Sequence, residues 1–324
     1  MHTPWGEVAV LDAHVHFFSY RFFTLLAAQK AGLAQPSAEA ATGILEWETP
    51  PPEPVELGRR WVQELDCHGV EKAAIIASLP GDEDSVVAAA TAFPGRFYGY
   101  FLLNPCAPDA LERAGRVLSH AEIRGICFFP AMHGYPVNAE PVRAVLDLAA
   151  QRQGTVVFVH CGVLTVGARK KLGLPSPFDM RYSNPIDLHP VALRYPELPF
   201  VVPHFGAGYF REALMLCDLC PNVYLDTSST NSWTRYQAPA IQLKDVFARA
   251  LDVAGPRRLL FGTDSSYFPR GWHAAVFRQQ VEALSAIGVS EEQVRDILGG
   301  NLRRLLDWEY NSPRKGLQPA FQQV

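Results

Sequence analysis

Short runs of apolar residues recur along the chain, and a loop and a helix-like stretch follow most of them. Eight of these runs are nearly continuous in apolar character, which is typical of strands that are covered on both faces. They predict strands at residues 8–12, 72–78, 97–103, 123–129, 155–160, 199–203, 223–226 and 258–263. Amphipathic stretches between them predict helices, among them residues 55–68, 138–153, 209–219, 240–254 and 272–287.

The alternation of strands and helices predicts a parallel sheet, because parallel strands need long crossover connections. Eight strands in a chain of this length favour a distorted (β/α)8 barrel, or TIM barrel, as one domain over residues 1–324 with its core at about 9–307. A doubly wound open sheet is the alternative, but no Gly-x-Gly-x-x-Gly turn follows the first predicted strand. Residues 17–54 and 162–187 form long loops after the first and fifth strands, where a barrel has its active-site mouth.

Composition argues against several classes of function. Of the 324 residues, 48% are apolar and 19% are charged, so the chain can build a substantial core. The net charge is −4 and the longest basic run is Arg169, Lys170 and Lys171, so nucleic acid is not an expected partner. The chain shows neither a membrane-spanning run of about twenty apolar residues nor the pattern of a signal peptide. Six cysteines without a disulfide framework predict buried free thiols, and these features together predict a cytoplasmic protein.

Histidine and aspartate side chains follow several of the predicted strands. The first strand ends in His14 and His16, the fifth in His160, the sixth in His204, and the eighth in Asp264. In a barrel these strand ends meet at one mouth. His14 and His16 are two residues apart and face the same side of an extended strand, so both imidazoles can bind one ion. A third imidazole and a carboxylate complete a site for a divalent transition metal, which would make hydroxide available near neutral pH.

The segments around these residues resemble the amidohydrolase superfamily. Within it they are most similar to the amidohydrolase-related branch that also contains the aminocarboxymuconate-semialdehyde-decarboxylase-like enzymes. The resemblance covers about residues 9–307 and implies a metal-dependent barrel enzyme. It rests on Leu-Asp-Ala-His14-Val-His16, Val-Phe-Val-His160-Cys-Gly, Val-Pro-His204-Phe-Gly-Ala-Gly, Leu-Phe-Gly-Thr-Asp264 and Ile297-Leu-Gly-Gly-Asn301-Leu-Arg-Arg-Leu-Leu.

The resemblance implies His14, His16, His160 and Asp264 as metal ligands. It implies His204 as either a further ligand or an acid/base group that orients the attacking water, and we favour the second role. Members with two metals often carry a carboxylated lysine after the fourth strand, whereas this chain reads Gly-Ile-Cys-Phe-Phe-Pro there. That departure favours a single ion, which we expect to be Zn²⁺, with Mn²⁺ as the alternative.

Two reactions fit these ligands. The first is hydrolysis of an ester, lactone or amide of a small organic substrate, with Asp264 or His204 shuttling the proton. The second is non-oxidative decarboxylation of an unsaturated or aromatic acid, because fold and metal do not fix the chemistry. We favour hydrolysis because Gly-Ala-Gly follows His204, without the glutamate that decarboxylases often carry there. A metal-free binding protein or inactive barrel is a third hypothesis, disfavoured by the presence of every expected ligand.

Four further residues are candidates for substrate contact. His133 lies in the loop after the fourth strand, and Arg169 and Arg181 in the loop after the fifth could meet a substrate carboxylate or simply face solvent. Asp226 ends the seventh strand and could hydrogen-bond a ligand histidine or cap a turn. The expected partner is a small molecule, with no nucleic acid and no membrane, and relatives of this kind are often homodimers.

Overall fold

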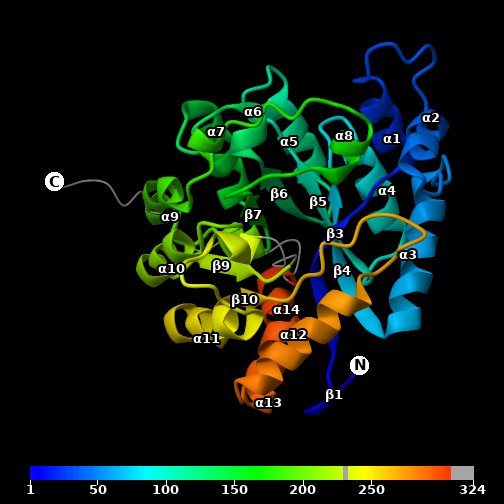
Figure 1. The fold of residues 1–324 in the computed structure, drawn as a ribbon. Coiled ribbons are helices and arrows are strands. Elements are labelled where there is room, and N and C mark those ends of the chain that lie inside the picture. Colours follow the sequence, from blue (N-terminus) through cyan, green and yellow to red (C-terminus); the bar gives the residue numbers. More distant parts are fainter. Residues whose placement is uncertain (229–232, 308–324) are drawn as a thin grey trace.

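The computed structural model describes residues 1–228 and 233–307, and its centre is an eight-stranded parallel sheet (Figure 1). Along the sheet the strands follow chain order, and every neighbouring pair is parallel. This arrangement confirms the predicted (β/α)8 barrel. The strands are β3 Val10–His16, β4 Val70–Ala77, β5 Phe97–Leu102, β6 Ile123–Phe128, β7 Val156–Val159, β8 Phe200–Val202, β9 Val223–Asp226 and β10 Leu259–Leu260.

The first and last strands meet in a short contact, which we call the seam, and this contact nearly closes the sheet into a barrel. Strand β10 has only two residues, and the segment after it continues the contact with β3. The Asp264 amide donates to the His14 carbonyl at 2.9 Å, and the His16 amide donates to the Ser265 carbonyl at 2.7 Å. The seam therefore runs directly through the residues that were expected to bind metal.

The first strand is longer than predicted, because a bulge extends it past Asp12. Between Asp12 and Val15, β3 advances by three residues while β4 advances by two. One extra residue reverses the alternation of side chains and can redirect them near an active site. Ala13 accordingly packs inside the barrel, Val15 packs outside it, and His14 and His16 face the mouth.

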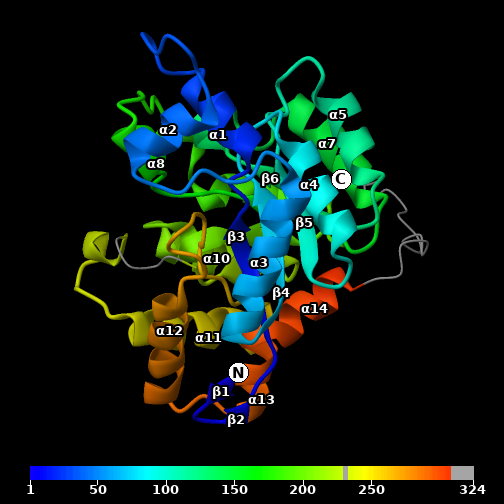
Figure 2. The same ribbon diagram turned by 90° about the vertical axis from the view of Figure 1, so that its right-hand side faces the viewer.

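Helices surround the barrel, as Figures 1 and 2 show from two sides. The helix predicted from residue 138 begins instead at Glu140, since Ala139 takes the N-cap position and Pro141 occupies the first turn. The surrounding helices are α3 Pro54–His68, α4 Glu83–Ala92, α5 Ala110–Leu118, α7 Glu140–Ala150, α9 His189–Arg194, α10 Phe210–Leu219, α11 Leu243–Ala254, α12 Ala274–Ala286, α13 Glu291–Arg295 and α14 Asn301–Leu306.

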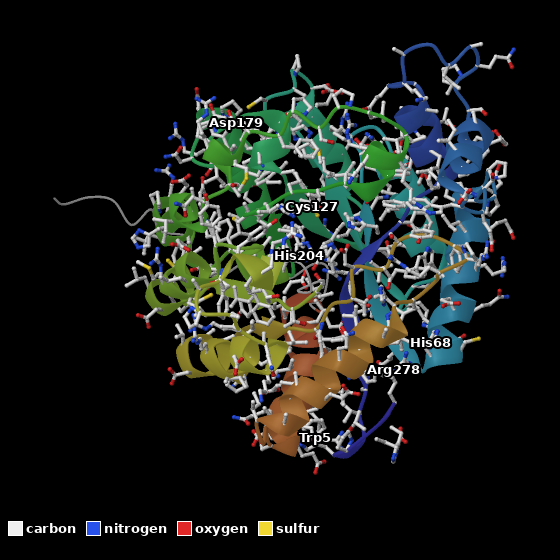
Figure 3. All side chains as sticks on the ribbon, in the orientation of Figure 1. Trp5, His68, Cys127, Asp179, His204 and Arg278 are labelled. Carbon is white, nitrogen blue, oxygen red and sulfur yellow. The ribbon has the colours of Figure 1, made fainter. Side chains whose placement is uncertain are left out.

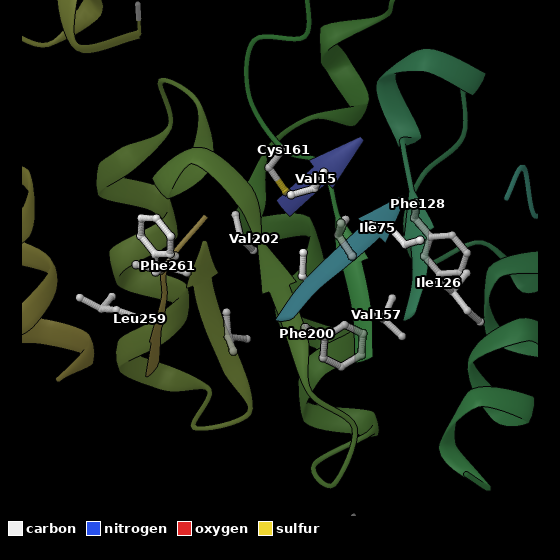
Figure 4. Close-up of a cluster of buried hydrophobic side chains, with 14 of the residues drawn as sticks. Val15, Ile75, Ile126, Phe128, Val157, Cys161, Phe200, Val202, Leu259 and Phe261 are labelled. Atoms are coloured by element: carbon white, nitrogen blue, oxygen red, sulfur yellow. The ribbon is translucent and has the colours of Figure 1, made fainter. Parts of the chain in front are cut away.

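The two faces of the strands form two separate cores. Side chains on the outer face, such as Val157 and Phe200, pack against the helices (Figure 4). Side chains on the inner face fill the barrel itself, with Tyr98, Tyr100 and Phe158 the largest of them. The barrel is thus a packed support below the mouth and not a pore.

The two long loops together build a third core above the mouth. They carry helices α1 Tyr20–Ala27, α2 Ala38–Leu45 and α8 Gly167–Lys171. Apolar residues of both loops, including Phe22, Leu26 and Leu172, form one buried cluster that is distinct from the two barrel cores. We call α1, α2, α8 and their connecting segments the cap. Figures 1 and 2 both show the cap at one end of the barrel and the N-terminus at the other.

Two further expectations concern helices and cysteines. No helix within residues 1–228 and 233–307 has the length and apolar character that a membrane span needs. All six cysteines are free, but Cys67 and Cys106 are exposed, so the expectation that every thiol is buried was wrong for these two.

Candidate metal centre and active site

A cavity of about 570 Å³ lies between the barrel mouth and the cap. Its floor carries the five residues that the sequence predicted as metal ligands or acid/base groups, and its walls carry residues of the cap. Figure 3 places His204 close to the centre of the molecule. The five floor residues are His14, His16, His160, His204 and Asp264.

Three of the predicted ligands converge most closely. Atoms of His14, His16 and Asp264 that can bind a metal all lie within 4.8 Å of one another. The Asp264 Oδ1 atom is 3.1 Å from His16 Nε2 and 3.7 Å from His14 Nε2. Two imidazole nitrogens and one carboxylate oxygen are thus arranged around a common point, as metal ligands are.

Acceptors behind the rings hold the proton of three histidines on Nδ1. His14 Nδ1 lies 2.6 Å from the Asp226 carboxylate, and His204 Nδ1 lies 2.9 Å from the Ser228 carbonyl. His16 Nδ1 lies 2.7 Å from the Ser78 hydroxyl, which itself donates to a backbone carbonyl and so accepts from the ring. With Nδ1 protonated, each ring keeps the lone pair of Nε2, which is how second partners orient metal-binding histidines.

His160 meets the cavity from β7 in a different way. Its ring stacks on Phe129, with centroids 5.1 Å apart, and lies 5.4 Å from the ring of His204. Its Nδ1 atom is buried without a hydrogen-bond partner, and so is Nε2 of His14. Buried nitrogens rarely lack a partner in folded proteins. A cation bound among these rings would satisfy both atoms.

Backbone strain accompanies two of the site residues. His204 has a φ of 56° and Asp264 a φ of 59°, a left-handed conformation that is uncommon for residues other than glycine. The seam hydrogen bond from the Asp264 amide to the His14 carbonyl holds one of them. The other follows β8 in a tight turn, in which the Ala207 amide donates to the His204 carbonyl.

Asp12 forms hydrogen bonds with both sides of the seam. This fully buried carboxylate accepts hydrogen bonds from the amides of His14 and Thr263, from the Thr263 hydroxyl and from the Trp272 indole. Burial raises the pKa of Asp12 to about 6, although these hydrogen bonds favour the charged form. Asp12 therefore fixes the backbone of one candidate ligand, His14, and the residue before another, Asp264.

Two glycines allow the backbone to approach closely at the site. A Cβ atom on Gly262 would lie 2.6 Å from Asp226 Oδ1 and 3.0 Å from the Cβ of His14. A Cβ atom on Gly162 would lie 2.2 Å from the carbonyl oxygen of Gly206, in the turn that holds His204. Larger residues at either position would push the ligand-bearing segments apart.

The electrostatics of the site suit a cation. Burial lowers the pKa of His16, His160 and His204, so these rings are neutral donors near pH 7. Burial opposes charge on His14, but the carboxylates of Asp226, Asp264 and Asp12 together outweigh it and raise the pKa of His14 to about 8. Burial alone would raise the pKa of Asp264, yet its interactions with His16 and His14 hold it well below its usual range. His16, His160 and His204 thus offer neutral nitrogens and Asp264 offers an ionised carboxylate, the forms in which metals are bound, whereas His14 would release a proton when a cation binds.

The candidate substrate contacts divide into two groups. His133, on α6 Pro130–His133, and Arg169, on α8, line the cavity. Arg181 does not: its side chain is 82% exposed and pairs with Asp179, which Figure 3 shows near the edge of the molecule. Asp226 is fully buried behind His14 and is absent from the cavity lining, so its contact is with a histidine and not with a substrate.

Sequence reasoning missed several residues that shape the site. Ser78 and Ser228 orient ring nitrogens, but isolated serines give no signal of that role. Asp12 did give a sequence signal, because a carboxylate in an apolar strand needs buried hydrogen-bond partners. Arg270, in the segment after β10, lines the cavity and was not among the basic candidates.

Comparison with known proteins places this arrangement in a family. The family model described as amidohydrolase matches residues 11–308. The protein fluG of Emericella nidulans is 30% identical over 238 residues, which is 68% of this chain but only 26% of that protein. The chain therefore spans about a quarter of that relative.

Two solved structures share the fold. A 5-carboxyvanillate decarboxylase from Novosphingobium aromaticivorans, with bound manganese, has a TM-score of 0.60 at 17% identity and matches 93% of this chain and 97% of its own. A probable 2-pyrone-4,6-dicarboxylic acid hydrolase from Acinetobacter baumannii has a TM-score of 0.57 at 15% identity and matches 91% and 98%. At these identities the likeness concerns the fold alone.

We predict that His160→Ala lowers metal affinity by at least tenfold, because its buried Nδ1 atom would no longer be available to a cation. Metal content after dialysis, measured by inductively coupled plasma mass spectrometry, checks this. His120→Ala, at a histidine outside the cavity, is the matched control. Wild-type metal content in His160→Ala would remove His160 from the ligand set.

Proposed function

Because the chain belongs to the amidohydrolase family and is an enzyme of that type, we propose that it hydrolyses an ester, lactone or amide bond of a small organic substrate with one divalent metal ion. The observation that carries the proposal is the convergence of His14 Nε2, His16 Nε2 and Asp264 Oδ1 on the floor of a cavity. His204 faces the same cavity from another strand end. Ligands and a free base thus lie around one substrate-sized space.

The donor set fits such an ion. His14, His16, His160 and Asp264 would hold it, and two buried ring nitrogens among them otherwise lack partners. A bound divalent cation lowers the pKa of water and polarises a carbonyl group. Imidazole and carboxylate donors suit Zn²⁺, and we propose Zn²⁺ with Mn²⁺ as the alternative. Strand β6 ends at Phe128 and is followed by Phe129 and Pro130, with no lysine to bridge a second ion, which supports a single metal.

His204 is the residue we assign to proton transfer. Its Nδ1 atom is held by the Ser228 carbonyl, so its Nε2 atom keeps a lone pair that can accept a proton from water. Its ring lies 5.1 Å from that of His14, close to the proposed ligands but outside their closest group. The strained turn fixes the ring, so little reorganisation is needed during the reaction. Asp264 is the alternative proton carrier, but its Oδ1 atom already lies against His16.

Decarboxylation of an unsaturated or aromatic carboxylic acid is the second candidate function. The cavity favours it in one respect, because Phe18, Phe22, Trp47 and Phe129 give it walls that suit a flat ring. In that reaction His204 would deliver a proton to the carbon that loses carbon dioxide. A carbon–carbon lyase and a hydrolase would therefore use the same histidine in opposite directions.

A substrate panel tests the proposal. We expect zinc- or manganese-loaded protein to hydrolyse at least one lactone, ester or amide, as measured by a pH indicator for lactones and esters and by amine release for amides. Parallel detection of carbon dioxide with aromatic acids separates the second reaction from the first. Release of carbon dioxide without hydrolysis would overturn the hydrolase assignment in favour of the lyase.

We predict that His204→Asn lowers kcat by about 10²- to 10⁴-fold while metal content stays near that of the wild type, because the change removes an acid/base group and not a ligand. Steady-state kinetics and metal analysis on the same preparation measure both quantities. Asparagine keeps a polar side chain of similar reach beside Ser228. Loss of the metal would instead identify His204 as a further ligand.

A further inference from the structure

Three cationic side chains line the cavity, and they come from two separate parts of the chain. Arg169 and Lys171 lie on α8 of the cap, and Arg270 lies in the segment after β10. Among the described lining residues, Asp264 is the one carboxylate, and it lies against the histidines of the floor. The cavity therefore has an excess of positive charge even before any metal ion is counted.

These three cations have no acidic partner within residues 1–228 and 233–307. Arg169 donates to the Pro175 carbonyl and to the Gln29 side chain, both neutral. Arg270 donates to the Asp264 backbone carbonyl and to the Ser266 hydroxyl.

Four arginines outside the cavity differ from these three cations. Arg113, Arg116, Arg181 and Arg295 each form an ion pair with a carboxylate. Their charges are neutralised by neighbouring residues, whereas those of the three cavity cations are not.

An aromatic pair connects the two sources of charge. Trp47 of the cap stacks on Tyr267 of the segment after β10, with ring centroids 3.7 Å apart and planes 8° from parallel. The Lys171 ammonium lies 5.8 Å from the centre of the Trp47 ring, and the Arg270 guanidinium lies 4.7 Å from that of Tyr267. Contacts between cations and aromatic rings restrain both side chains near the stacked pair. Through this aromatic pair, α8 of the cap and the segment after β10 meet at the same cavity.

We propose that the substrate is an organic anion whose acid group, remote from the reacting bond, is bound by Arg169, Lys171 and Arg270. An unpaired guanidinium or ammonium gains most from a carboxylate, with which it makes charge-assisted hydrogen bonds. The aromatic and aliphatic walls would hold the body of the anion, and the volume of about 570 Å³ suits a small molecule. The reaction at the floor rests on the proposed function, whereas recognition of the anion does not.

Neighbouring basic residues supply matched controls. Lys170 is next to both α8 cations in sequence but does not line the cavity, and Arg181 is paired with Asp179 outside it. Replacing either one removes a positive charge from the same loop without changing the cavity. A general loss of surface charge would affect all the variants alike, whereas loss of a binding site would not.

Calorimetric binding of isophthalate and of its neutral analogue isophthalamide tests the proposal in zinc-loaded and in metal-free protein. We expect the wild type, Lys170→Gln and Arg181→Gln to bind the dianion about tenfold or more tightly than the diamide. The triple variant Arg169→Gln/Lys171→Gln/Arg270→Gln should lose that preference, and each single variant part of it. Circular dichroism checks that the triple variant is folded.

Two results would overturn the proposal: equal affinity of the wild type for both probes, or an unchanged preference in the folded triple variant. Because binding is also measured in metal-free protein, where the proposed metal-dependent reaction cannot take place, the outcome does not depend on hydrolysis of either probe. A failed substrate panel with intact anion preference would count against the proposed reaction alone. A successful panel with no such preference would count against the anion site alone.

Discussion

The closure of the barrel is the constraint on which the rest of the site depends. Strand β10 is too short to pair with β3 along its length, so the hydrogen bonds from the Asp264 and His16 amides complete the barrel at the mouth. Those bonds join the strand that carries two histidines to the loop that carries the aspartate. Asp12 joins both sides of the same seam, because it accepts hydrogen bonds from the amides of His14 and Thr263. The contact that closes the fold is therefore also the contact that sets the distance between three proposed ligands.

Because the fold has three separate cores, the residues that stabilise the barrel differ from those that select the substrate. The inner and outer faces of the strands hold the floor residues in fixed positions, and strain at His204 and Asp264 can persist because the surrounding structure is packed. The cap has its own apolar cluster, and Phe22, Leu26 and Ala168 of that cluster also line the cavity. Substitutions in the cap can thus change which molecule binds while leaving the metal ligands in place, as is common for loops at the mouth of this fold.

The sequence was sufficient for the strands, the two long loops and the gathering of five polar residues at one mouth, because nearly continuous apolar runs mark strands in a parallel barrel. It could not show the bulge after Asp12, since bulges depend on pairing with the neighbouring strand. Nor could it show that Ser78 and Ser228 orient rings from other strands. Asp226 and Arg181 were both candidate substrate contacts in the sequence. In the structure Asp226 is buried behind His14, whereas Arg181 pairs with Asp179 outside the cavity. Contacts between distant segments decide such cases, and only a fold reveals them.

The central claim is that this seam builds one metal site. The most direct test is the metal content of the purified wild-type protein after loading with Zn²⁺ or Mn²⁺ and removal of excess ion. The structure predicts about one equivalent per chain, because His14, His16 and Asp264 surround one point and no lysine follows β6 to bridge a second ion. Two tightly bound equivalents, or far less than one, would contradict it.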